Sequence, residues 1–194
     1  NYLLNEQQDQ AIDAFIEAVQ KDPDTSELHF ALGNLFRRRG EYERAVRVHE
    51  HLLSRADLSQ SDRDRAQHAL AQDFLKAGLL DRAEDALRKL EGTRYEEQAW
   101  LTLLSLHERA RDWPQAATVA GRLQASGQAD FSARQAHYLC EQAAEALNKK
   151  HDAQAAQQLL LQAVEQTPSA ARPRIQLAGL LAGRDDWSGA FEQL

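Results

Sequence analysis

The feature that most restricts the fold of this chain is a sequence frame that recurs along it. The segments "AIDAFIEAVQKDP" (11–23) and "AAQQLLLQAVEQTP" (155–168) share the same order: a small residue, an apolar residue four positions later, a small residue three later, and a proline five later. This order matches the A-x3-F and P positions in the second helix of a tetratricopeptide repeat, a helical hairpin of about 34 residues. The frame therefore predicts stacked helical hairpins.

The same small position can be followed through the whole chain. It is filled by alanine six times, with spacings of 34, 38, 33, 40 and 34 residues: Ala11, Ala45, Ala83, Ala116, Ala156 and Ala190. The two long spacings predict longer connections at "ADLSQSDRDR" and "ASGQADFSAR". The first helix of each hairpin agrees, because Leu32, Gly33 and Phe36 fill the L-G-x2-Y positions of the second copy.

These positions predict an all-α, right-handed tetratricopeptide-repeat solenoid of five to six helical hairpins. The turns inside the hairpins are expected near Gly40, Gly78 and Arg111. Both Asn1 and Leu194 fall inside predicted helices, so we expect the array to be truncated at both ends. We expect one domain over 1–194, with repeats at approximately 1–25, 26–62, 63–96, 97–130, 131–170 and 171–194.

Composition and motifs argue against several classes of function. The single cysteine, Cys140, excludes an internal disulfide and any zinc site that needs two or more cysteines, and a formal net charge of −7 argues against a general nucleic-acid binder. No apolar run reaches the roughly 20 residues of a spanning helix. The sequence contains no phosphate-binding loop, His-x3-His pair or serine nucleophile elbow. We therefore expect no enzyme and no cofactor within this segment.

Two carboxylates beside tryptophans could suggest acid–base chemistry, but a structural role explains them better. Asp112 in "RDW" and Asp186 in "RDDW" fall in predicted turns, where aspartate commonly caps the following helix. Cys140 occupies the tryptophan position of its repeat and is expected to be a buried small residue, since free cysteine is among the most buried residue types.

A cluster of cations interrupts the second copy, in "LGNLFRRRGEYERA" (32–45). The repeat frame assigns positions on the first helices to a concave face, and in the second and third copies these positions are largely basic. The predicted partner-binding groove consists of Phe30, Asn34, Arg37, Arg38, Arg65, His68, Gln72 and Lys76. Clustered arginines suit the recognition of carboxylates or phosphates. In the fifth copy the corresponding positions carry Glu141, Glu145 and Lys149, so we expect the face to turn mixed to acidic there.

A second interpretation of the arginines stays open. Arg37 to Arg39 lie in the predicted last turn of a helix, where cations interact favourably with the helix dipole by about 0.3–1 kcal/mol. That effect needs no ligand. It does not account for Arg65 and Lys76 on the next first helix, and we expect Arg39 to point away from the groove.

Particular runs go beyond the general repeat pattern. "LGNLFRRRGEYERAVRVHEHLL" (32–53), "DFLKAGLLDRAEDALRKL" (73–90) and "AHYLCEQA" (136–143) resemble the cytoplasmic repeat region of the lipopolysaccharide assembly protein B family (LapB, or YciM) of Gram-negative bacteria. The general consensus does not require R-G-E-x-x-R-A-x-R-x-H or L-x-D-R-A-E-D. The resemblance extends over essentially all 194 residues.

The resemblance implies a non-enzymatic adaptor on the cytoplasmic side of the bacterial inner membrane. Members of the family have an N-terminal membrane helix, the repeat array, and a rubredoxin-like module that binds metal through four cysteines. They promote degradation of the deacetylase that commits precursors to lipid A, together with a membrane-anchored AAA metalloprotease. The implied partners are these two proteins and other proteins of lipopolysaccharide assembly. Whether the protein also forms a homodimer stays open. Neither flanking part lies in this sequence, so the resemblance implies a soluble fragment without a metal site.

A more general function remains as an alternative. The chain fits a generic peptide-binding repeat scaffold, or a co-chaperone module that clamps a C-terminal carboxylate with residues such as Asn34, Arg38 and Lys76. An apolar helix upstream and two C-x2-C pairs downstream in the parent gene would favour the adaptor, because a clamp protein would lack both.

Overall fold

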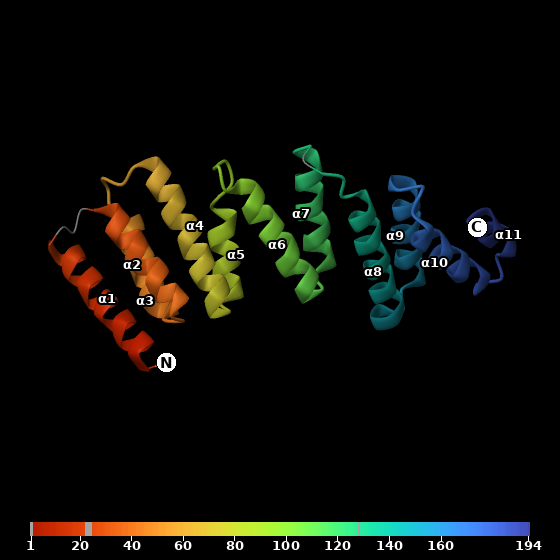
Figure 1. Cartoon of the computed structure of the whole chain (residues 1–194). Helices are drawn as coiled ribbons and strands as arrows, with labels where there is room; N and C mark the ends of the chain where they lie inside the picture. The colour runs from red at the N-terminus through yellow and green to blue at the C-terminus, as the bar shows by residue number, and fades with distance from the viewer. Residues whose placement is uncertain (1, 22–24, 128) are drawn as a thin grey trace. The chain divides into compact units, whose positions relative to one another are not determined.

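The chain folds into antiparallel helices that follow one another directly (Figure 1). The structure, a computed structural model, describes residues 2–21, 25–127 and 129–194, and these contain helices and no strands. The helices are α1 (Tyr2–Lys21), α2 (Ser26–Arg38), α3 (Tyr42–Ser54), α4 (Gln60–Ala77), α5 (Leu80–Arg88), α6 (Glu96–Ala110), α7 (Trp113–Ala125), α8 (Ser132–Lys150), α9 (Ala153–Gln166), α10 (Ala171–Ala182) and α11 (Trp187–Glu192).

The helices belong to two compact units, residues 1–99 and 100–194, with the division inside α6. In the first unit α2 packs on α3, α3 on α4, and α4 on α5, while α2 also contacts α4. In the second unit α7 packs on α8, α8 on α9, α9 on α10 and α10 on α11, while α8 also contacts α10. Each unit therefore has the alternating helix order of stacked hairpins. The placement of all residues in a single array stays a prediction.

The turns inside the hairpins share one backbone conformation. Gly40 and Gly78 have φ values of 79° and 74°, and Arg111, His151 and Asp185 have φ values of 57°, 52° and 61° at the corresponding turns. This left-handed conformation ends a helix sharply and redirects the chain, and glycine adopts it with least strain. The predicted turns at Gly40, Gly78 and Arg111 are confirmed.

Small residues at the recurring position bring the paired helices together. Ala45, Ala83, Ala116 and Ala156 are each 0% exposed, which is the role that the sequence frame assigns to them. In the first unit Ala45 packs with Leu32 and Phe36 across the α2–α3 hairpin. In the second unit the core around Ala156 is formed by α8, α9, α10 and α11, and it includes Cys140. Cys140 is 0% exposed, as expected, and burial raises the pKa of its thiol, so the thiolate is disfavoured.

The carboxylates beside the tryptophans cap helices. Asp112 accepts a hydrogen bond from the backbone N–H of Gln115 at the start of α7, and Asp186 accepts one from Gly189 at the start of α11. A side-chain cap of this kind stabilises a helix by about 1 kcal/mol. Their predicted structural role is confirmed.

Candidate functional site

The predicted partner-binding residues lie on two helices of the first unit. Phe30, Asn34, Arg37 and Arg38 belong to α2, and Arg65, His68, Gln72 and Lys76 belong to α4. We call this surface the α2–α4 face. The two helices contact each other, and side chains of one bond to the other, so the structure brings the two sets together.

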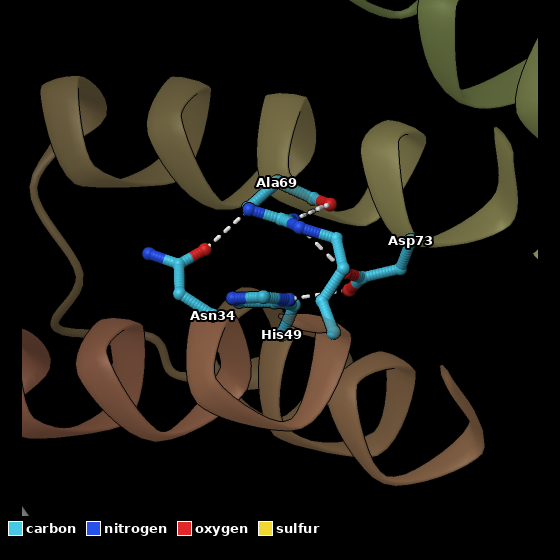
Figure 2. Close-up of polar contacts among 5 residues, drawn as sticks. Asn34, His49, Ala69 and Asp73 are labelled. Carbon is cyan, nitrogen blue, oxygen red and sulfur yellow. Dashed lines mark hydrogen bonds and ion pairs between the residues drawn. The ribbon is translucent and has the colours of Figure 1, made fainter. Parts of the chain in front are cut away.

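The centre of the α2–α4 face is a buried carboxylate that was not among the site residues predicted from the sequence. Asp73 of α4 is 0% exposed. One carboxylate oxygen accepts a hydrogen bond from Nη1 of Arg37 at 2.9 Å, and the other accepts one from Nδ1 of His49 at 2.5 Å. The three residues come from α4, α2 and α3, so this interaction ties three helices together. Figure 2 shows the bonds converging on Asp73.

Arg37 is held on both of its terminal nitrogens. Nη1 also donates to the carbonyl oxygen of Ala69 at 3.0 Å, and Nη2 donates to Oδ1 of Asn34 at 2.5 Å. We call Asn34, Arg37, His49, Asp73 and the Ala69 carbonyl the Asp73 cluster (Figure 2). Because the Arg37 charge faces a buried carboxylate, most of its field is cancelled within the protein. Arg37 therefore orders this surface and contributes little free charge to a partner.

The position of His49 depends on a glycine. A Cβ atom placed on Gly33 would lie 2.6 Å from Cε1 of His49 and closer still to Nε2. His49 is 0% exposed, and its Nε2 has no hydrogen-bond partner among the described residues. Because a carboxylate can only accept, the Nδ1–H of His49 is the donor in its bond to Asp73. Gly33 thus allows close packing of α2 on α3 and seats the imidazole.

Phe30 lies beneath the face and does not line it. Its ring is 1% exposed, and the guanidinium of Arg65 stacks over it with 4.0 Å between the central carbon and the ring centroid. Arg65 also pairs with Glu27 of α2, with 2.5 Å between Nη1 and Oε1. Both groups of this ion pair reach solvent, so its contribution to stability is about 1 kcal/mol or less. Phe30 is available to a partner only if Arg65 moves aside.

His68 contributes a ring to the face and no positive charge. It stacks on Tyr95, with ring centroids 4.4 Å apart and planes 8° from parallel. Burial lowers the pKa of His68, and the positive charge of Arg37 lowers it further. The imidazole is therefore neutral at pH 7, and it does not add to the basic character that the sequence suggested for this position.

The exposed cations of the face are Arg38 and Lys76. Neither has an ion-pair partner among the described residues. Gln72, also on α4, is half-buried. Arg39 points elsewhere, as expected, and pairs with Glu41 at 2.8 Å. Arg38 and Lys76 are the charges that a partner can reach without breaking an internal bond.

Over residues 2–21, 25–127 and 129–194, no cluster of three or more His, Cys, Asp or Glu side chains could hold a metal ion. No helix within these ranges is long and apolar enough to cross a bilayer.

Comparison with known proteins identifies the relatives of the chain. Lipopolysaccharide assembly protein B of Escherichia coli strain K12 is 35% identical over 195 aligned residues, which cover 100% of this chain and 50% of that protein. The chain is homologous to lipopolysaccharide assembly protein B. This confirms the family resemblance seen in the sequence. The Haemophilus influenzae protein of the same name is 33% identical over 132 residues, covering 63% of the chain and 33% of that protein.

The chain thus spans about half the length of the E. coli lipopolysaccharide assembly protein B. No protein-family model matches it. Among solved structures, a tetratricopeptide repeat protein from Parabacteroides merdae has a TM-score of 0.52 with 14% identity, covering 99% of this chain and 73% of that one. The all-α repeat fold is confirmed by this likeness and by the helix order. The names of these relatives denote an assembly protein and a repeat protein, and neither denotes a catalytic family.

Proposed function

We propose that this chain is the partner-binding region of a non-enzymatic adaptor that regulates lipopolysaccharide synthesis at the inner membrane. The observation that carries the proposal is homology to lipopolysaccharide assembly protein B over the full chain. A repeat array supports such a role because each hairpin adds surface to a continuous scaffold without any catalytic group. In this proposal the protein acts by holding other proteins.

The adaptor promotes degradation of the deacetylase that commits precursors to lipid A. It holds a segment of one partner while a membrane-anchored AAA metalloprotease is near, which converts a bimolecular encounter into a local one. Effective concentrations produced by short tethers reach the millimolar range, so no bond chemistry is required of the adaptor. The lipopolysaccharide supply then follows the amount of deacetylase that survives.

The α2–α4 face is the proposed contact for an acidic segment of the partner. Arg38 and Lys76 are exposed and unpaired in the described residues, whereas Arg37 and Arg65 are engaged by Asp73 and Glu27. Exposed charge pairs contribute about 0.2–1 kcal/mol each, so these two cations mainly guide association and orientation. The Asp73 cluster keeps the surface between them rigid, which lowers the entropy cost of binding.

Reversing the two exposed charges tests this contact. In the full-length protein, the double variant Arg38→Glu and Lys76→Glu should slow deacetylase degradation by about threefold to tenfold, which corresponds to the loss of one or two modest charge pairs. Its melting temperature should stay near that of the wild type, because neither side chain forms an ion pair with another residue that the structure describes. The measurements are the deacetylase half-life after protein synthesis is stopped, and thermal unfolding.

Arg47→Glu with Lys89→Glu is the matched control. Both side chains are exposed, on α3 and just after α5, and the double change alters net charge equally. Normal degradation in the control and slow degradation in the α2–α4 variant support the proposal. If the deacetylase half-life is the same with the wild type, the α2–α4 variant and the control, the α2–α4 face is not the contact. Binding to a C-terminal carboxylate peptide, with no effect on the deacetylase, would favour the co-chaperone alternative.

A further inference from the structure

The two arginines that form ion pairs across the α2–α4 face differ in how firmly they are held. The Arg37–Asp73 pair is closed, because Asp73 is 0% exposed and both of its carboxylate oxygens are bonded inside the protein. The Arg65–Glu27 pair is open to solvent, with 36% of the Arg65 side chain and 71% of the Glu27 side chain exposed. Of these two arginines, Arg65 is the one that can change partners without leaving a buried charge unpaired.

Arg65 already binds a carboxylate in the way that suits a guanidinium. Its Nη1 donates to Oε1 of Glu27 at 2.5 Å, and its Nη2 donates to Oε2 at 3.3 Å, so one guanidinium engages both oxygens. The ring of Phe30 supports the guanidinium from one side, with 4.0 Å between the central carbon and the ring centroid. The Arg65 guanidinium is therefore a carboxylate-binding group, oriented by Phe30, that a residue of the same protein occupies.

Glu27 is a weak occupant of this group. It lies in the first turn of α2, and most of its side chain is exposed. Exposed ion pairs contribute little net free energy, because water competes for both charges and two long side chains lose rotamer freedom. For a pair of ordinary exposed strength, Arg65 is free in about one sixth to two fifths of the molecules. A carboxylate from another molecule therefore competes with Glu27 for Arg65.

Arg65 lies far enough from the two exposed cations of the face to need its own contact. Arg65 and Lys76 are eleven residues apart on one side of α4, which corresponds to about 16 Å along a helix. Arg38 is at the last turn of α2, whereas Glu27 is at the first. A chain spans at most about 3.3–3.6 Å per residue, so a segment of five or more residues reaches both ends of the face.

We propose that Glu27 is an internal competitor for the acidic segment that binds the α2–α4 face, and that Arg65 is the group for which the two compete. In the free protein Glu27 occupies Arg65. A segment that already contacts Arg38 and Lys76 places its next carboxylate near Arg65 at high effective concentration and displaces Glu27. An isolated carboxylate lacks this advantage, so Glu27 favours partners with several acidic residues. The inference rests on the proposed contact of an acidic segment with this face.

Binding of a labelled, capped hexaglutamate peptide to the full-length protein, followed by fluorescence anisotropy, measures the competition directly. Glu27→Gln should strengthen binding by about twofold to sixfold, because no internal carboxylate then occupies Arg65. Glu43→Gln is the matched control, since Glu43 is exposed in the first turn of α3 and its replacement removes the same charge at the same place in a helix. Equal gains in the two variants would show a general effect of net charge and would overturn the proposal.

A double-variant comparison separates competition for Arg65 from simple repulsion of an acidic ligand. Arg65→Gln should weaken peptide binding by about twofold or more, and adding Glu27→Gln to it should have little further effect, since the contested group is gone. If Glu27→Gln strengthens binding equally with and without Arg65, the glutamate acts by repulsion alone and the competitor role is wrong. Circular dichroism of each variant checks that the fold is retained.

The variant Arg38→Glu with Lys76→Glu distinguishes failure of this inference from failure of the proposed contact. If that variant loses affinity for hexaglutamate while Glu27→Gln binds like the wild type, the contact stands and the internal competitor is wrong. If the charge reversal leaves the affinity unchanged, or if neither the wild type nor Glu27→Gln binds the peptide, acidic segments do not bind this face and both proposals fall.

Discussion

Replacing Asp73 with alanine is expected to lower the free energy of unfolding by about 3 kcal/mol. Removal of one partner from a buried ion pair costs about 3–5 kcal/mol, because the other groups stay buried without compensation. Here His49 is fully enclosed and loses its acceptor, whereas Arg37 is 21% exposed and can turn part of its charge to water. The expected value therefore lies at the low end of that range. Urea unfolding followed by circular dichroism measures it.

Asp85→Ala is the control for this change, because Asp85 is exposed on α5 and should alter stability by less than about 0.5 kcal/mol. A second comparison isolates the cluster. In a His49→Leu background, Asp73→Ala should cost less than it does alone, since one of the two bonds is already absent. Equal costs in both backgrounds, or an Asp73→Ala protein as stable as the wild type, would show that the cluster does not hold the three helices together.

Gly33→Ala is the second large effect, with an expected loss of about 2–3 kcal/mol. Helix propensity alone predicts a gain of about 1 kcal/mol, because alanine favours the helix interior. The new methyl group would instead collide with the His49 ring, and that ring cannot retreat without leaving Asp73. Overpacking of this kind costs about 1–3 kcal/mol, and loss of the buried hydrogen bond adds to it. Thermal or urea unfolding measures the balance.

Gly179→Ala gives the opposite sign and serves as the control. Its Cβ would meet no atom within 4 Å, so the helix gain of up to about 1 kcal/mol should appear. Combining Gly33→Ala with His49→Ala should restore part of the stability lost by Gly33→Ala, because the colliding ring is gone. Destabilisation that persists in full with His49→Ala would place the cause outside this contact.

The fold could be predicted because its determinants are local and repeated. Ala45, Ala83 and Ala116 occupy the same place in successive hairpins, and each is completely buried. The left-handed turn at Gly78 follows from glycine ending a helix just before a new apolar pattern. Arg111 adopts the same conformation without being glycine, and only its position in the repeat pointed to a turn. A fixed period thus carries information that single residues lack.

The chemistry of the α2–α4 face was less predictable, because it depends on contacts between helices. The sequence placed Arg37 and Arg65 on one face, but it did not show that they would pair with Asp73 and Glu27 of the neighbouring helices. One signal for Asp73 was present: it follows Leu70 by three residues on the apolar side of α4, where an acid must find a partner. The sequence did not show which residues would pair with Asp73, because that depends on how α2 and α3 pack against α4.

The same limit explains the second unit. Glu141 and Glu145 fall on predicted concave positions and suggest an acidic surface, whereas Arg172 lies 31 residues from Glu141 and neutralises it from the next first helix. Counting charges along one helix does not reveal pairs formed between helices.

Site-specific crosslinking in cells tests most directly whether the α2–α4 face holds a protein partner. A photoreactive residue is placed at position 38 or 76 of the full-length protein, or at position 47 as the control on α3. We predict that positions 38 and 76 crosslink to the deacetylase or to the membrane protease, and that position 47 does not. Crosslinks to either partner that form at position 47 and are absent at positions 38 and 76 would contradict the account.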